Sequence, residues 1–180
     1  AGHRLSGMPQ PAAPTEAEDV EHVLNLDGGP IADNAAAWLG ADAEAIAAMP
    51  DGGFFVAEEY GPSLLRVGAD GVVAARWVPA SQEIAPNRTD LPVFGLLPQA
   101  AAKRRPNRGL EALCASADGN WLYLGMQGAL AGEDEASVPV WKLNAATGAQ
   151  AAEWRYPFDA PSSFKRDAAR RKVGVRDLKV

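Results

Sequence analysis

The sequence predicts an all-β protein made of β-propeller blades, each a four-stranded antiparallel sheet. Short apolar runs alternate with Gly, Pro and Asp-Gly turn signals, and helical periodicity is nearly absent. A pattern of acid, turn and aromatic positions also recurs at a sequence offset of 67 (111 − 44). The chain holds about 2.7 such repeats (180/67), which predicts an incomplete propeller of two to three blades.

The chain divides into an arm and a repeated region. Residues 1–20 are rich in Pro, Ala and Glu without a hydrophobic period, which predicts a linker or disordered arm. Residues 21–180 form the expected partial propeller, with units at about 40–106 and 107–172 and a third unit beginning near 173. Only 34–39 and 99–104 favour brief helices, because Ala, Leu, Lys and Arg are good helix formers.

The first unit supplies four strand signals in order. They are Glu44-Ala45-Ile46, Phe54-Phe55-Val56 after the turn Asp51-Gly52, Leu65-Arg66-Val67, and the run that ends in Trp77 after the turn Asp70-Gly71. Asp-Gly between apolar runs predicts a hairpin, because Gly adopts the positive φ of the turn without steric cost. The repeat is longer than common propeller repeats, and the excess lies in 79–108, where we expect a functional loop.

The second unit repeats these signals. They are Glu111-Ala112-Leu113, Trp121-Leu122-Tyr123 after Asp118-Gly119, Trp141-Lys142-Leu143, and Trp154 after Thr147-Gly148. The offset of 67 holds through the first hairpin, whereas the second turn is offset by 77 (148 − 71), which indicates an acidic insertion near 128–138. A third copy begins at 175–178, since Asp177 follows Glu111 at an offset of 66 (177 − 111). Two meanders of a β-sandwich are the alternative, which the matched positions disfavour.

Composition excludes several classes of function. The net charge of −6 provides no positive field to hold nucleic acid or an anionic membrane. No apolar run reaches the roughly 18 residues of a membrane span, so we expect a soluble protein. The one cysteine, Cys114, forms no internal disulfide, and His3 and His22 precede the repeats. A metal would therefore be bound through oxygen ligands.

Common hydrolase motifs are missing. Gly61-Pro62-Ser63-Leu64-Leu65 begins like a nucleophile elbow, but Leu65 stands where Gly is needed and the repeats contain no histidine base. The sequence also lacks a P-loop, a dinucleotide glycine fingerprint and a His-Glu-x-x-His motif. Ser63 is therefore interpreted as a turn residue.

The repeated acids Glu44, Glu111 and Asp177 are the candidate metal ligands. If each opens the inner strand of its blade, the three carboxylates point toward one channel, where they repel unless protons or a cation neutralise them. Ca²⁺ suits this arrangement because it accepts about six to eight oxygen ligands with tolerant geometry. The alternative is structural, with each acid accepting hydrogen bonds from backbone N–H groups of the neighbouring blade.

Two segments are candidates for substrate binding. Glu59 and Tyr60 lie in Glu58-Glu59-Tyr60-Gly61-Pro62, where a Gly-Pro bend forms a suitable pocket rim. The segment 103–111 gathers four cations before Glu111, of which Arg105 and Arg108, with Asn107, are the best candidates for holding an anion. A solvated basic loop is the alternative, and we prefer it for Lys103 and Arg104.

These segments resemble a known family. Asp51-Gly52-Gly53-Phe54-Phe55-Val56-Ala57-Glu58-Glu59-Tyr60-Gly61-Pro62, Arg105-Pro106-Asn107-Arg108-Gly109-Leu110-Glu111, Tyr156-Pro157-Phe158-Asp159 and Arg176-Asp177-Leu178 are similar to the "esterase-like activity of phytase" family of phytase-like β-propellers. The resemblance implies a secreted or periplasmic bacterial propeller, longer than this chain, with esterase or phosphoesterase activity. The remaining blades are then missing from these 180 residues.

Three functions follow from these expectations. The first is a hydrolase of phosphoester or ester bonds, assisted by Ca²⁺ on the channel acids, in which Arg105 and Arg108 hold a small anionic or ester substrate. The second is a non-catalytic propeller that binds a ligand or protein, and the third is a lactonase-like hydrolase that uses the same acids. Under the hydrolase hypotheses Glu111 is the most consequential side chain.

Overall fold

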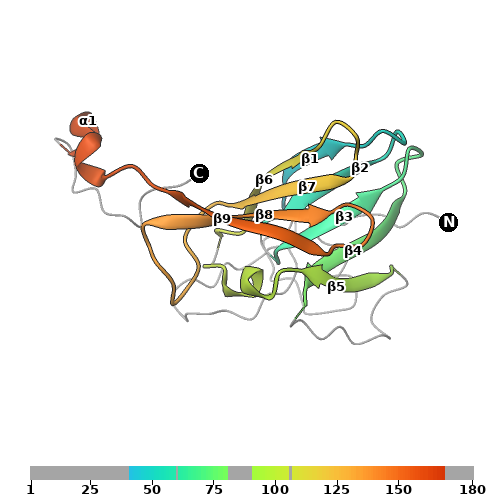
Figure 1. Ribbon diagram of the computed structural model, residues 1–180, viewed down its shortest axis with the longest axis horizontal. Coiled ribbons are helices and arrows are strands. Elements are labelled where there is room, and N and C mark those ends of the chain that lie inside the picture. Colours follow the sequence, from blue (N-terminus) through green and yellow to red (C-terminus); the bar gives the residue numbers. More distant parts are fainter. Residues whose placement is uncertain (1–40, 60, 81–90, 106, 169–180) are drawn as a thin grey trace, which may run out of the picture.

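The computed structural model describes residues 41–59, 61–80, 91–105 and 107–168, which form two β-sheets (Figure 1). The predicted all-β fold with blade-like antiparallel sheets is confirmed. The expected arm at 1–20, the helix at 34–39 and the third unit near 173 lie outside the described residues. No described helix is long and apolar enough to cross a membrane.

The first sheet has five strands in chain order. They are β1 (Ala43–Ala48), β2 (Phe54–Glu58), β3 (Ser63–Val67), β4 (Val73–Pro79) and β5 (Val93–Leu97). The first four form the predicted antiparallel meander, whereas β5 pairs with β4 in parallel.

The segment 79–108 differs from its prediction as a loop, because β5 and the 3-10 helix η3 (Gln99–Lys103) lie within it. The outer edge of β4 offers backbone hydrogen-bonding groups, and the apolar run Val93–Leu97 pairs with them. The brief helix predicted at 99–104 is confirmed as η3.

The second sheet has the four antiparallel strands that the sequence predicts. They are β6 (Leu110–Ala115), β7 (Trp121–Met126), β8 (Ser137–Asn144) and β9 (Gln150–Pro157). A 3-10 helix, η4 (Pro161–Ser163), and a one-turn helix, α1 (Lys165–Ala168), follow β9. Strand β6 lies beside β1, so the two sheets meet along their first strands (Figure 1).

The predicted offset of 67 through the whole first hairpin is wrong after the turn. Met49 N donates to Gly53 O at 2.9 Å, whereas Ser116 N donates to Trp121 O at 2.8 Å, so the second turn is one residue longer. Strand β6 follows β1 at an offset of 67 (115 − 48), but β7 follows β2 at an offset of 68 (122 − 54). Because a one-residue slip reverses the face of every side chain, Tyr123 and not Leu122 is the counterpart of Phe55.

One apolar cluster holds the two sheets together. It contains large buried side chains of both sheets: Phe55, Leu64, Trp77, Leu110, Leu122, Leu124, Trp141 and Leu143. A second, smaller cluster covers the other face of the first sheet, with Leu65, Val67, Val73 and Leu91. The first sheet is therefore packed on both faces, which holds the ends of β1 and β2 in place beside the start of β6.

Candidate metal and anion site

The repeated acids Glu44 and Glu111 both lie at β-bulges. The register of β1 with β2 shifts between Ala43 and Ala45, and the register of β6 with β7 shifts between Leu110 and Ala112. A bulge leaves one residue unpaired and re-aims its side chain. Since β1 and β6 are neighbours, both acids are directed to the place where the sheets meet.

The two carboxyl groups interact. Partial burial raises the pKa of Glu44 above its ordinary value, and the charges of Glu111 and Asp42 raise it further, as does a side-chain hydrogen bond with Glu111. A like charge this close to Glu44 disfavours its ionised form. The structure therefore brings Glu44 and Glu111 close to one another, whereas Asp177 lies outside the described residues, so the predicted meeting of all three acids stays a prediction.

Asp42, Glu44 and Glu59 form a carboxylate cluster in which each residue offers one oxygen and these oxygens lie within 4.8 Å of one another. Asp42 immediately precedes β1 and Glu59 immediately follows β2, so the antiparallel pairing brings them together. A hydrogen bond of 3.0 Å from Glu59 N to Asp42 O fixes this end of the hairpin. Glu59 is only 4% exposed, whereas Glu44 is exposed, so the cluster joins a buried end to an open one.

Sequence reasoning placed Glu59 on a substrate rim and missed Asp42. Asp42 carries no motif of its own, and its role depends on the pairing of β1 with β2, which places it opposite the end of β2. The only available signal was its position two residues before the repeated acid Glu44. Tyr60, the other predicted rim residue, lies outside the described residues.

A buried carboxyl group supports the bend that carries Glu59. Glu58 is fully buried, and its carboxylate accepts hydrogen bonds from Gly61 N at 3.2 Å and from Ser63 Oγ at 3.1 Å. Burial raises the pKa of Glu58 to about 7, although the charge of Arg76 and these hydrogen bonds oppose the shift. Burial likewise lowers the pKa of Arg76 to about 10, against the effect of Glu58. The pair and its hydrogen bonds order the backbone next to the carboxylate cluster.

The cationic segment lies against the same bend. A Cβ atom at Gly109 would overlap the carbonyl oxygen of Glu59, so only glycine allows the two backbones to approach this closely. Gln127 N donates to Gly109 O at 2.8 Å, and Gln127 Nε2 donates to Glu111 Oε1. The two segments that the sequence singled out separately therefore form one site, joined to the second sheet through Gln127.

The predicted anion-binding residues lie in different environments. Arg105 Nη2 forms an ion pair of 2.6 Å with Glu135 Oε1 of the acidic insertion. Arg108 is half-buried, with its side chain packed so closely on Gly128 that a Cβ there would lie 2.8 Å from Arg108 Cδ. Asn107 is exposed and has a positive φ of 50°, which marks a tight turn. Arg105 is thus occupied by an internal carboxylate, while Arg108 lies between that turn and β6.

Residues 7–180 match the family model described as "Phytase-like: Esterase-like activity of phytase". The chain belongs to this family. The resemblance carried by the Glu-Tyr-Gly-Pro and Arg-Pro-Asn-Arg-Gly strings is confirmed, and the family indicates a hydrolase-type propeller. No curated protein and no solved structure matches the chain.

The donor set of this phytase-like chain fits a hard divalent cation. All three members of the cluster offer carboxylate oxygens, with Glu111 beside Glu44. Ca²⁺ accepts such ligands in varied geometries, whereas zinc sites in proteins are built mainly from Cys and His. A cation would also remove the repulsion that raises the pKa of Glu44. The residues present are therefore suited to hold Ca²⁺.

Proposed function

We propose that this chain forms part of a hydrolase that cleaves phosphoester or ester bonds with the help of a bound Ca²⁺ ion. Its membership of the phytase-like family supports a hydrolase-type propeller. The observation that carries the proposal is the carboxylate cluster, with oxygens of Asp42, Glu44 and Glu59 within 4.8 Å of one another. The negative charges of carboxylates gathered so closely repel one another, and a bound cation would neutralise that repulsion.

Each acid has its own part in the proposal. Asp42, Glu44 and Glu59 hold the ion, and Glu111, steadied by Gln127, adds charge beside Glu44. When bound, a divalent ion polarises a substrate oxygen and lowers the pKa of a bound water. The nearly complete burial of Glu59 keeps bulk water from one side of the site, which strengthens its electrostatic interactions.

The cations of 105–108 serve the substrate in different ways. Arg108, half-buried beside the site, donates to the anionic oxygens of a small phosphate or ester substrate. Arg105 anchors the loop through Glu135, so its contribution to substrate binding is indirect. Asn107, exposed at the turn, lies on the substrate rim in this proposal.

We also propose that the protein acts outside the cytosol. The family resemblance implies a secreted or periplasmic protein, and extracellular calcium sites commonly work with affinities of about 10⁻⁴–10⁻³ M. A site with a few carboxylates at an open sheet end, where Glu44 is exposed, is consistent with affinities of this kind.

The proposal is tested by a hydrolysis screen with phosphomonoesters, phytate, carboxylic esters and lactones, each with Ca²⁺ and with a chelator. We expect Ca²⁺-dependent cleavage that falls at least tenfold in Glu44→Gln and Asp42→Asn. The matched control is Asp159→Asn, which removes one exposed acid outside the cluster and should retain the wild-type rate. Cleavage of lactones alone would favour the lactonase-like hypothesis, and no cleavage under any metal condition would favour a binding module.

A further inference from the structure

The carboxyl group of Glu58, at the end of β2, joins three segments of the first sheet. Its side chain is fully buried, and Oε1 accepts hydrogen bonds from Asp42 N at 3.4 Å and from Gly61 N at 3.2 Å. The other oxygen, Oε2, accepts from Gly61 N at 3.2 Å and from Ser63 Oγ at 3.1 Å. One side chain therefore connects the residue before β1, the bend after β2 and the start of β3.

Two of these contacts lie next to members of the carboxylate cluster. Asp42 is itself a member, and Gly61 lies two residues after Glu59. The same two backbone segments are joined directly by the hydrogen bond of 3.0 Å from Glu59 N to Asp42 O. Glu58 adds a second link, which restricts how far the backbones of Asp42 and Glu59 can move apart.

A buried cation accompanies this carboxyl group. Arg76 of β4 is fully buried, and its charge favours the ionised form of Glu58. The burial of two opposite charges is costly, and apolar side chains of similar volume often give equal or greater stability. The stability of the sheet alone therefore does not explain why Glu58 and Arg76 stand at these positions.

The second sheet keeps the backbone contact of this hairpin but loses two of the acids. Gln127 N donates to Gly109 O at 2.8 Å, as Glu59 N donates to Asp42 O in the first sheet. Gln127 follows Glu59 at the offset of β7, which is 68 (127 − 59). Gly109 follows Asp42 at the offset of β6, which is 67 (109 − 42). Of the three acids in the cluster, only Glu44 has an acidic counterpart in the second sheet.

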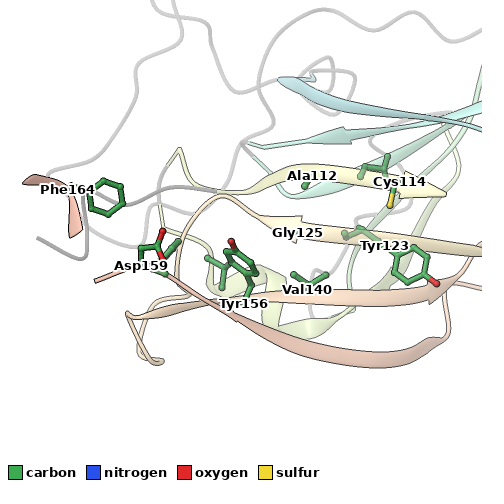
Figure 2. A pocket seen from close by; sticks show the side chains of 12 residues that line it. Ala112, Cys114, Tyr123, Gly125, Val140, Tyr156, Asp159 and Phe164 are labelled. Atoms are coloured by element: carbon green, nitrogen blue, oxygen red, sulfur yellow. The ribbon is translucent and has the colours of Figure 1, made fainter. Parts of the chain in front are cut away.

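The buried pair is lost together with these acids. Met126 occupies the position of Glu58 at the offset of 68 (126 − 58), and Glu153 occupies that of Arg76 in the pairing of the third and fourth strands. Met126 packs in the apolar cluster that the two sheets share, while its neighbour Gly125 lines an apolar groove on the other face (Figure 2). This end of the hairpin therefore forms without a carboxylate in the second sheet.

We propose that Glu58 is a positioning residue of the metal site. Its carboxylate holds the backbones of Asp42 and Glu59 at the separation at which their side-chain oxygens face one cation, and Arg76 balances its charge. The inference rests on the proposed function, since it takes the carboxylate cluster as the site of Ca²⁺. The pair and the complete cluster occur together in the first sheet, and both are replaced in the second.

The test replaces both charges by methionine, the residue that the second sheet has at the position of Glu58. Glu58→Met/Arg76→Met leaves neither charge alone, so its melting temperature in a chelator should fall by less than about 3 °C. Its Ca²⁺ affinity in a calorimetric titration should fall at least about tenfold, because Asp42 N and Gly61 N lose their acceptor. A variant with the wild-type melting temperature and the wild-type Ca²⁺ affinity would overturn the inference.

Ser63→Ala is the matched control. It removes the hydrogen bond to Glu58 Oε2 and leaves the contacts with Asp42 N and Gly61 N in place. We expect a melting temperature lower by about 2–4 °C with an unchanged Ca²⁺ affinity. If Ser63→Ala weakened Ca²⁺ binding as much as the double variant, loss of stability would account for both results and the positioning role would be wrong.

Two single variants decide the question if the double variant does not fold. Glu58→Gln keeps the side-chain length and one acceptor oxygen but loses the charge opposite Arg76. Glu58→Asp keeps the charge but withdraws the carboxylate from Asp42 N by one methylene group. Positioning predicts that Glu58→Gln binds Ca²⁺ more tightly than Glu58→Asp, and the reverse order would overturn the inference.

Hydrogen exchange in the metal-free protein distinguishes the inference from the proposed function. In the double variant and in Glu58→Asp, the amides of Asp42 and Gly61 should exchange at least about tenfold faster than in the wild type, with unchanged exchange in the middle of β2. Unchanged exchange at both amides would overturn the inference whether or not Ca²⁺ binds. Faster exchange in the variants, with no Ca²⁺ binding by the wild type, would overturn the proposed function and support Glu58 as the residue that positions Asp42 and Glu59.

Discussion

The carboxyl group of Glu44 interacts with that of Glu111, its counterpart in the second unit at an offset of 67 (111 − 44). Each acid lies at a β-bulge in the first strand of its sheet. The repeat therefore preserves both the acid and the backbone irregularity that directs it. Negative charge is concentrated where the two sheets meet, and repulsion between the carboxylates lowers the stability of the metal-free protein.

Glu44→Gln should make the metal-free protein slightly more stable. Desolvation and the charges of Glu111 and Asp42 raise the pKa of Glu44, so its ionised form is less favourable than that of a free glutamate. Removal of the charge should raise the free energy of unfolding by about 0.5 kcal/mol and abolish stabilisation by Ca²⁺. Thermal unfolding with a chelator and with Ca²⁺ measures both effects. A variant that is less stable without metal but still stabilised by Ca²⁺ would make Glu44 a structural acid.

Gly109→Ala should disturb the site through the backbone. The new Cβ would meet the carbonyl oxygen of Glu59, which cannot move without shifting the bend. We expect a loss of about 2–3 kcal/mol in the free energy of unfolding, together with weaker Ca²⁺ binding. Gly132→Ala is the control, since Gly132 has a positive φ of 75° with nothing near its Cβ position, and it should cost about 1 kcal/mol. Equal losses in both variants, measured by denaturant unfolding, would contradict the close approach.

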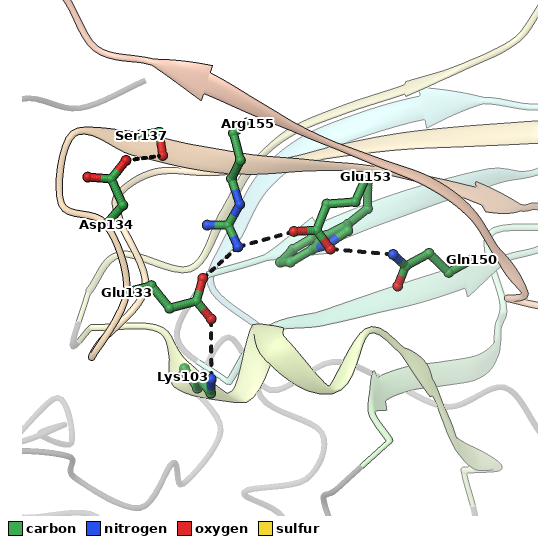
Figure 3. A network of polar contacts seen from close by, with 8 residues as sticks. Lys103, Glu133, Asp134, Ser137, Gln150, Glu153 and Arg155 are labelled. Carbon is green, nitrogen blue, oxygen red and sulfur yellow. Dashed lines mark hydrogen bonds and ion pairs between the residues drawn. The ribbon is translucent and has the colours of Figure 1, made fainter.

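Glu133 of the acidic insertion joins Arg155 and Lys103 (Figure 3), and these ion pairs should make the stability of the protein depend on pH. Glu133 accepts from Arg155 at 2.6 Å and from Lys103 at 3.2 Å, and its interaction with Arg155 is the main cause that lowers the pKa of Glu133. A lowered folded-state pKa contributes stability above the ordinary value of 4.5, which is lost as the pH falls through the folded value. Because Arg155 and Lys103 are largely exposed, screening limits the contribution to about 0.5–1 kcal/mol.

Glu133→Gln should therefore lower the free energy of unfolding at pH 7 by that amount. The difference from the wild type should shrink as the pH falls below 4.5, and also at about 1 M salt. Denaturant unfolding at several pH values measures it, with Asp159→Asn as the control for loss of an exposed acid. A difference that stays constant from pH 7 to pH 3 would rule out the ion-pair origin.

Substitutions of Arg105 and Arg108 should have different effects on KM. Arg105 is paired with Glu135, so Arg105→Met should lower stability by less than about 1 kcal/mol and change KM only modestly. Arg108→Met should raise KM for an anionic substrate at least tenfold with little effect on a neutral ester. The measurement is steady-state kinetics on one substrate of each kind. The same change in KM for both substrates would argue against an anion contact at Arg108.

The sequence predicted the strands where local signals are strong. Asp-Gly turns with positive φ at Gly52 and Gly119 close both first hairpins as expected. The sequence did not predict β5, because Val93–Leu97 becomes a strand only through parallel pairing with β4, which is a tertiary contact. The sequence also did not predict the extra residue in the turn before Trp121. That residue follows Asp118-Gly119, so the alignment of Asp118-Gly119 with Asp51-Gly52 is the same with or without it.

The candidate site residues were likewise predicted only where a signal in the local sequence marked them. Repetition identified Glu44 and Glu111, and their local composition identified Glu59 and Arg108. Asp42 depends on the antiparallel pairing of β1 with β2 for its position beside Glu59. The ion pair of Arg105 with Glu135 joins side chains far apart in the sequence, so no spacing rule within 103–111 could have found it.

Calorimetric titration with Ca²⁺ is the direct test of the carboxylate cluster as a metal site. We expect the wild-type chain to bind one Ca²⁺ ion with a dissociation constant of about 10⁻³ M or tighter. Asp42→Asn and Glu44→Gln should each weaken this binding at least tenfold, and Asp159→Asn should leave it unchanged, because only the first two remove oxygens of the cluster. No binding by the wild type at about 10 mM Ca²⁺, or equal binding by all four proteins, would contradict the assignment of Asp42, Glu44 and Glu59 as a metal site.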